Sequence, residues 1–239
     1  MLVLALDTCD ARGSIALVRD SAVVAAVTHP EAEDYSSWLI PAANATLRSA
    51  KLTHGDLGAY AVSCGPGSFT GVRVGLATVK AWAEVFAKPV AAVSRLRALA
   101  SIAVASAPLV AAFIDAHRGQ VFGGLYSRCG ESLERVEDEL VTPPAAFLEW
   151  VSARAGTQQI AWISLDPLIL TTLDAWKART ARGERLESAP SHLAPRIAHL
   201  GIREIAQGRA VDPLTLDANY VRRSDAELLW KDKPPVPAR

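Results

Sequence analysis

Two stretches of this chain repeat one pattern: an apolar strand ends in an aspartate, a tight turn follows, and a second apolar strand runs back. The first begins at Leu4-Ala5-Leu6-Asp7 and the second at Ala112-Phe113-Ile114-Asp115. Because a repeated supersecondary pattern indicates related structural units, the chain is expected to form an α/β protein of two similar lobes. Each lobe would be a mixed sheet with helices packed on it.

Hydrophobic periodicity and turn residues divide the chain into alternating strands and helices. Strands are expected at residues 2–7, 14–19, 22–28, 59–64, 89–93, 109–115, 120–127 and 160–165. Helices are expected from residue 34 or 36 to 50 and at residues 70–87, 94–105, 143–154, 166–179 and 191–207. The expected divisions are an N-terminal lobe at 1–107, a C-terminal lobe at 108–212, and a C-terminal segment at 213–239 whose proline-rich end is extended.

The charge balance limits the ligands that such a protein can bind. The chain has 25 Lys and Arg residues against 25 Asp and Glu residues, and its first 120 residues carry 10 basic and 9 acidic side chains. A protein that grips duplex nucleic acid over a broad face usually has a basic excess, so that role is disfavoured. Three widely spaced cysteines without a CxxC pair, and no signal-peptide or membrane-span pattern, indicate a reduced cytoplasmic protein.

The most specific segment is the glycine-rich stretch at residues 64–75 (CGPGSFTGVRVG), which follows a predicted strand and opens a predicted helix. N–H groups at the start of a helix can bind an anion, which makes Gly67 and Ser68 candidate ligand-binding residues. The spacing does not match a Walker A loop, and Ser68 lacks the flanking glycines of a nucleophile elbow. A plain strand-to-helix turn, capped by Ser68 or Thr70, explains the segment at least as well.

Glycines inside the helix that follows need their own explanation, because each costs about 1 kcal/mol relative to alanine. Close approach of another element is the usual compensation. One interpretation is tight packing within the lobe, and the other is a subunit interface made by this helix and the helix that ends near residue 50. The second interpretation predicts a partner interface of Trp38, Leu39, Ala42, Gly71, Val72, Gly75, Leu76, Val79 and Trp82.

Four stretches together resemble the TsaB family, also called YeaZ. They are residues 4–8 (LALDT), 65–73 (GPGSFTGVR), 114–122 (IDAHRGQVF) and 219–222 (NYVR). The resemblance implies the two-lobed actin/Hsp70/sugar-kinase-like (ASKHA) fold, in agreement with the repeated strand pattern. It is weakest over residues 129–190, where it implies no function; Trp162 and Trp176 in this region are expected to fill the core.

The resemblance also implies a role. TsaB proteins are partners in the synthesis of threonylcarbamoyladenosine beside the tRNA anticodon. They are regarded as inactive relatives of the catalytic subunit TsaD, with which they form a heterodimer in an assembly that includes the ATPase TsaE. The chain is therefore expected to be a non-catalytic subunit that meets tRNA only indirectly, and to form a homodimer when it is alone.

Single residues bear on metal and nucleotide binding. The resemblance implies a His-x-x-x-His metal pair in a catalytic TsaD-like subunit, but the matching residues 35–39 read YSSWL. Asp7 and Asp115 lie at strand ends, where ATP-using members of the fold hold their metal, yet residues 9–12 replace the glycine-rich tip that would wrap phosphate. We thus expect no catalytic residue, metal or cofactor. Weak nucleotide binding would involve Asp7, Thr8, Gly67 and Ser68.

Two other functions stay open at this point. An ATP-dependent small-molecule kinase of the same superfold would need the phosphate-wrapping turn that residues 9–12 lack. A peptidase-like hydrolase would need a Ser-His-Asp or metal constellation, whereas the five histidines lie far apart in the sequence.

Overall fold

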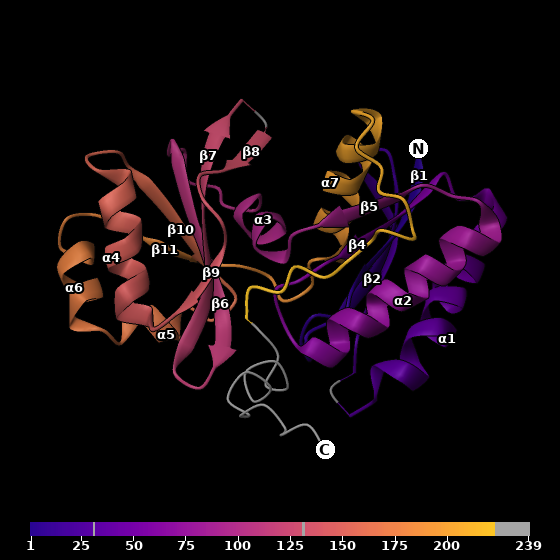
Figure 1. Ribbon diagram of the computed structural model, residues 1–239, viewed down its shortest axis with the longest axis horizontal. Coiled ribbons are helices and arrows are strands. Elements are labelled where there is room, and N and C mark those ends of the chain that lie inside the picture. The colour runs from indigo at the N-terminus through magenta and orange to yellow at the C-terminus, as the bar shows by residue number, and fades with distance from the viewer. Residues whose placement is uncertain (31, 131, 223–239) are drawn as a thin grey trace, which may run out of the picture.

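The computed structural model describes residues 1–30, 32–130 and 132–222. They form two lobes side by side, each built on one β-sheet, as the repeated strand pattern predicts (Figure 1). The end of the tail, predicted to be extended, lies outside the described residues. None of the described helices is long and apolar enough to cross a membrane.

The first lobe contains a five-stranded sheet in the order β3-β2-β1-β4-β5. Its strands are β1 (Leu2–Asp7), β2 (Ser14–Arg19), β3 (Ala22–Thr28), β4 (Ala59–Ser63) and β5 (Val90–Val93). Short turns join β1, β2 and β3, so these strands are antiparallel, whereas β4 and β5 follow helical crossovers and run parallel to β1. The register places Leu4 between Leu17 and Tyr60.

Helices cover both faces of this sheet (Figure 1). Alternate residues of a strand point to opposite faces: Leu4 and Leu6 meet one layer of helices, while Val3 and Ala5 meet the other. The first layer is α1 (Tyr35–Ser49) and α2 (Phe69–Phe86), and the second is α7 (Ala194–Ala206). A strand buried on both faces is apolar throughout, which explains the unbroken apolar run at the start of the chain. A 3-10 turn, η1 (His54–Asp56), leads into β4.

The second lobe contains a six-stranded sheet in which β11-β10-β6-β7-β8 are neighbours and β9 also pairs with β7. Its strands are β6 (Leu109–His117), β7 (Gln120–Cys129), β8 (Ser132–Arg135), β9 (Leu140–Thr142), β10 (Ile160–Ser164) and β11 (Leu186–Ser188). The helices on its outer face are α4 (Pro144–Ala155), α5 (Leu168–Thr171) and α6 (Asp174–Thr180). Trp162 and Trp176 are buried between this sheet and these helices, so their predicted role in the core is confirmed.

Two helices do not follow the predicted division at residue 107. α7, which the sequence analysis assigns to the C-terminal lobe, returns to the first sheet; a Cβ at its Gly201 would lie only 2.6 Å from the Ala61 Cβ, so glycine allows a close approach. α3 (Arg95–Ala100), assigned to the N-terminal lobe, packs against β6 and β7 of the second sheet. The core between the lobes therefore contains residues of both sheets and of both helices.

Two predicted helices differ in detail, and the structure adds three short strands. The helix expected at 94–105 ends at Ala100, because the N–H groups of Val104 and Ala105 donate to the Glu187 carboxylate at 2.8 and 2.9 Å rather than continuing the helix. The helix expected at 166–179 is divided into α5 and α6, with extended backbone at Leu173 between them. The short strands β8, β9 and β11 have no counterpart in the prediction.

Candidate functional site: the interlobe pocket and the outer helical face

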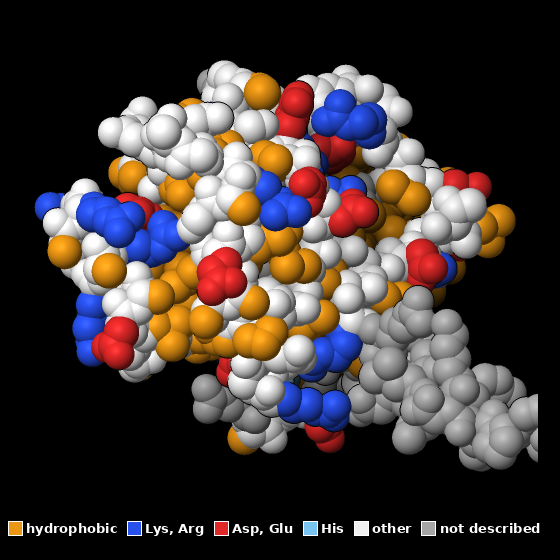
Figure 2. Space-filling view, turned by 60° about the vertical axis from the view of Figure 1, so that its left-hand side comes forward, with side chains coloured by type: hydrophobic (Ala, Val, Ile, Leu, Met, Phe, Trp, Pro, Cys, Tyr) orange, Lys and Arg blue, Asp and Glu red, His pale blue; other side chains and the backbone are white. Residues whose placement is uncertain are grey.

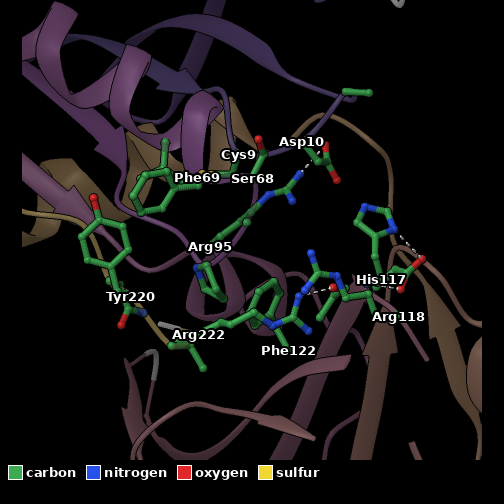
Figure 3. Close-up of a pocket in the computed structure, with 18 residues that line it drawn as sticks. Cys9, Asp10, Ser68, Phe69, Arg95, His117, Arg118, Phe122, Tyr220 and Arg222 are labelled. Atoms are coloured by element: carbon green, nitrogen blue, oxygen red, sulfur yellow. Dashed lines mark hydrogen bonds and ion pairs between the residues drawn. The ribbon is translucent and has the colours of Figure 1, made fainter. Parts of the chain in front are cut away.

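A pocket of about 570 Å³ lies between the lobes (Figure 3). Four segments supply most of its lining: the turn after β1, the glycine-rich loop before α2, the turn between β6 and β7, and the segment at residues 219–222. Val72, Arg95 and Phe122 add to it from α2, α3 and β7. The turns of the two repeated hairpins thus line the same cavity. Aromatic side chains contribute to its wall, together with charged ones; Phe69, Phe122, Tyr220, Arg95, Arg118 and Arg222 are among them.

The four residues expected to take part in weak nucleotide binding fall into two pairs. Gly67 and Ser68 line the pocket, whereas Asp7 and Thr8 are fully buried beside it. The Asp7 carboxylate accepts a 3.1 Å hydrogen bond from the Arg95 Nε, and the Thr8 hydroxyl donates a 2.6 Å hydrogen bond to the Gly71 carbonyl. Both of these polar groups are therefore occupied by contacts within the protein.

The glycine-rich loop packs directly against the turn after β1. The Ser68 N–H donates to the Cys9 carbonyl at 2.6 Å, and a Cβ at Gly67 would overlap that same carbonyl oxygen. The Ser68 hydroxyl caps α2 by accepting from the Gly71 N–H at 3.4 Å, as the simpler interpretation of the loop predicts. The glycines here are thus required by a close backbone approach.

Arg95 is the main residue that the sequence analysis missed. Its guanidinium is 1% exposed and pairs with Asp7 and, at 2.7 Å, with Asp10. Burial would raise the pKa of Asp10, but the charges of Arg95 and Arg12 outweigh it and lower that pKa to about 2. An arginine that follows a capping serine in a helix gives no local signal of such a role, since its partners are distant in the sequence.

The segment at residues 219–222 closes the remaining side of the pocket. The Asn219 side chain donates to Glu139 at 2.5 Å, and its backbone N–H donates to the Cys64 carbonyl at 2.7 Å, so it contacts both lobes. Tyr220 accepts a 2.9 Å hydrogen bond from Arg73. Arg222 donates to the Ala116 carbonyl at 2.8 Å. The sequence analysis used these four residues to recognise a resemblance, but it did not assign them to a pocket.

The predicted partner interface is mostly inside the first lobe. The buried members are Trp38, Leu39, Gly71, Val72, Gly75, Leu76 and Val79, and the half-buried ones are Ala42 and Trp82. The two helix glycines face the turn after β1: a Cβ at Gly71 would overlap the Thr8 carbonyl, and a Cβ at Gly75 would overlap the Thr8 hydroxyl. The glycines are therefore explained by packing within the lobe, which corrects the interface interpretation for these positions.

The opposite side of α2 faces outward. Ala77, Ala81 and Val85 follow one another at four-residue spacing and are exposed, Val85 to 75%. On α1, Ile40 is 49% exposed. The two helices lie side by side on the outside of the first sheet (Figure 1), so these small and apolar side chains belong to one helical layer.

Charge is distributed without a large basic area on the face where the second lobe comes forward: acidic, basic and apolar side chains are interspersed there (Figure 2). Among residues 1–30, 32–130 and 132–222, no group of three or more His, Cys, Asp or Glu side chains is placed to hold a metal ion.

Comparison with known proteins decides the family. The family model "TsaD: tRNA N6-adenosine threonylcarbamoyltransferase" matches residues 24–165. The chain is 30% identical to the "tRNA threonylcarbamoyladenosine biosynthesis protein TsaB" of Bacillus subtilis over 234 residues, which cover 96% of this chain and 98% of that protein. The chain belongs to the TsaB (YeaZ) family.

Solved structures agree with this TsaB assignment. YeaZ from Pseudomonas aeruginosa superimposes with a TM-score of 0.70 at 26% identity, covering 92% of this chain and 99% of that one. A ROK hexokinase from Thermus thermophilus matches in fold alone, with a TM-score of 0.50 at 13% identity over 87% of this chain and 100% of that one. The two-lobed ASKHA-type fold predicted for the chain is confirmed.

Proposed function

We propose that this TsaB-family protein is a non-catalytic partner subunit in the synthesis of tRNA threonylcarbamoyladenosine, and that it acts by forming a heterodimer with TsaD. The observation that carries the proposal is the outward stripe of α2. Ala77, Ala81 and Val85 present small or apolar side chains without a charge among them, and such surfaces suit close packing of a partner's helices. TsaE joins the same assembly in this proposal, and tRNA is met only through the partners.

A non-catalytic role fits the state of the polar groups around the pocket. Asp7 is paired with Arg95, and Ser68 caps a helix. Asp115, at the end of the second repeated strand, accepts from the His117 N–H at 2.7 Å and so stabilises its own turn. These side chains serve the fold, and we propose that the subunit works in the cytoplasm without a resident cofactor, with at most weak nucleotide binding.

The same outer face would also support self-association. In the proposal, a homodimer of this chain and the heterodimer with TsaD compete for α1 and α2, because both use the exposed sides of these helices. Addition of TsaD to the isolated protein should therefore convert one assembly into the other.

The test is co-elution with the TsaD of the same organism on size-exclusion chromatography. Ala81→Arg should weaken the heterodimer at least tenfold, because it buries an unpaired charge in the interface, and should leave the far-ultraviolet circular dichroism spectrum of the isolated protein unchanged. Val104→Arg is the matched control, since Val104 is 88% exposed and lies outside α1 and α2.

An assay of tRNA modification completes the test. With TsaD, TsaE and a supply of threonylcarbamoyl-adenylate, the wild-type protein should restore tRNA modification, and Ala81→Arg should fail to do so. Absence of any association between the wild-type chain and its own TsaD would refute the proposal, as would sustained ATP turnover by the isolated chain.

A further inference from the structure

Five charged side chains alternate in sign from the interior of the first lobe to the second lobe. The order is Asp7, Arg95, Asp10, Arg12 and Asp166. Successive partners lie 3.1, 2.7, 2.7 and 2.7 Å apart. Three acidic and two basic groups make up this ion-pair chain, and it runs beside the interlobe pocket, which Asp10 and Arg95 help to line (Figure 3).

The inner end depends on Arg95. Asp7 is fully buried, and an unpaired buried carboxylate is strongly disfavoured. Its second oxygen accepts from the Cys9 N–H at 3.1 Å, a donor without a charge, so the carboxylate charge must be neutralised from elsewhere. Two carboxylates that converge in this way are commonly neutralised by a divalent cation. Here the planar guanidinium of Arg95 reaches both Asp7 and Asp10 from the start of α3.

The outer end joins the lobes. Arg12 contacts Asp10 through Nε and Nη2, at 3.1 and 2.7 Å, and reaches the two oxygens of Asp166 at 2.7 and 3.3 Å. Asp166 is itself fixed, because it accepts from the Asp115 N–H at 2.8 Å and its own N–H donates to the Ser164 hydroxyl at 2.8 Å. The chain of ion pairs thus ends on a carboxylate that is tied to two strands of the second sheet.

We propose that Arg95 is a built-in cation of the interlobe cleft, which takes the place of a bound metal ion between Asp7 and Asp10 and, through Arg12 and Asp166, holds the two lobes in one arrangement without a ligand. The direction of two pKa shifts agrees with this role: Asp10 is stabilised as a carboxylate, and the pKa of Arg95 is raised because Asp7 and Asp10 outweigh the effect of burial. The role concerns the isolated chain and is independent of any partner.

The experiment is chemical rescue of Arg95→Ala in the full chain. The substitution should lower the melting temperature and speed hydrogen exchange in the turn after β1 and around Asp166. Because Arg95 borders the pocket, millimolar ethylguanidinium should enter the vacated space and recover part of the lost melting temperature. Arg97→Ala is the matched control: Arg97 is on the same helix and pairs with Glu204 at 2.6 Å, outside this chain of ion pairs. It should show no rescue.

A second comparison covers the case in which Arg95→Ala does not yield folded protein. Arg95→Met removes the cationic partner of the Asp7 carboxyl group, while Asp7→Asn combined with Arg95→Met removes both members of the pair. The double variant should melt above the single one. The proposal is overturned if the double variant is no more stable, if ethylguanidinium acts equally on Arg97→Ala, or if Mg²⁺ raises the melting temperature of the wild-type protein, because the cation position would then be vacant.

Discussion

Gly75 lies on the buried side of α2 beneath the turn after β1, and alanine at this position is expected to destabilise the protein. A Cβ there would overlap the Thr8 hydroxyl oxygen, although it would lie at ordinary contact distance, 3.5 and 3.6 Å, from the other two side-chain atoms of Thr8. The hydroxyl is held by its 2.6 Å hydrogen bond to the Gly71 carbonyl. The stability of the alanine variant therefore depends on the position of one atom, the Thr8 hydroxyl oxygen.

Two effects of opposite sign determine the magnitude. Helix propensity favours alanine over glycine by about 1 kcal/mol, and overpacking opposes it by about 1–3 kcal/mol. Gly75→Ala should therefore lower the free energy of unfolding by about 0–2 kcal/mol. In a Thr8→Ala background the overlap is absent, and the same substitution should stabilise the protein by up to about 1 kcal/mol. The coupling between the two changes should equal the overpacking cost, about 1–3 kcal/mol.

Urea denaturation of the wild type, both single variants and the double variant measures this cycle. Gly55→Ala is a suitable control, because the nearest atom to a Cβ at that glycine, the Thr53 hydroxyl oxygen, is 3.5 Å away. Additive effects within about 0.5 kcal/mol, with Gly75→Ala stabilising in both backgrounds, would refute the packing argument. A stable Gly75→Ala variant that no longer pairs with TsaD would return this glycine to the interface.

Two further predictions concern titratable groups. Burial raises the pKa of the half-buried Cys64 to about 12, and burial with the nearby Asp7 raises the pKa of the fully buried Cys9. A thiol reagent at neutral pH should therefore modify the exposed Cys129 first, Cys64 more slowly and Cys9 only on unfolding, as mass spectrometry of the labelled peptides would show. Labelling of Cys9 or Cys64 as fast as that of Cys129 would contradict this. The folded-state pKa of Asp10, about 2, is below its ordinary value of about 3.9. The contribution of the Asp10 carboxylate to stability should therefore be complete above about pH 3.9 and be lost as the pH falls toward 2. Asp10→Asn should flatten the acid side of the plot of unfolding free energy against pH, and an unchanged plot would count against the ion pair.

The sequence predicts most of the fold because the relevant information is local. β1 through β4, α1 and α2 follow from short apolar runs, three- and four-residue spacing and turn residues, and all lie within a few residues of their predicted bounds. The placement of α7 could not be predicted in this way, since its amphipathic pattern shows that it covers a sheet without showing which one. The return to the first sheet depends on Gly201 and Ala61, which are distant in the sequence.

The candidate site was predictable only in part for the same reason. Gly67 and Ser68 stand out because glycine and a capping serine have local signatures, and both line the pocket. Arg95 has no such signature: its partners Asp7 and Asp10 are about ninety positions earlier, and the ion pairs exist only after β1 and α3 have been brought together. Long-range charge pairing leaves no periodic trace in a single sequence.

The glycine-rich segment also shows how a specific motif can mislead about a surface. Gly67, Gly71 and Gly75 lack side chains because the backbone and hydroxyl groups of Thr8 and Cys9 occupy that space, so the motif records contact between two parts of one lobe. A surface for another protein must then lie on the other side of α2, where residues have side chains that reach solvent. The proposed interface consequently depends on the outward stripe of this helix, while the glycines fix the position of the helix against the sheet. Substitutions on the outward side of α2 should therefore change partner binding, and substitutions on its glycine side should change stability.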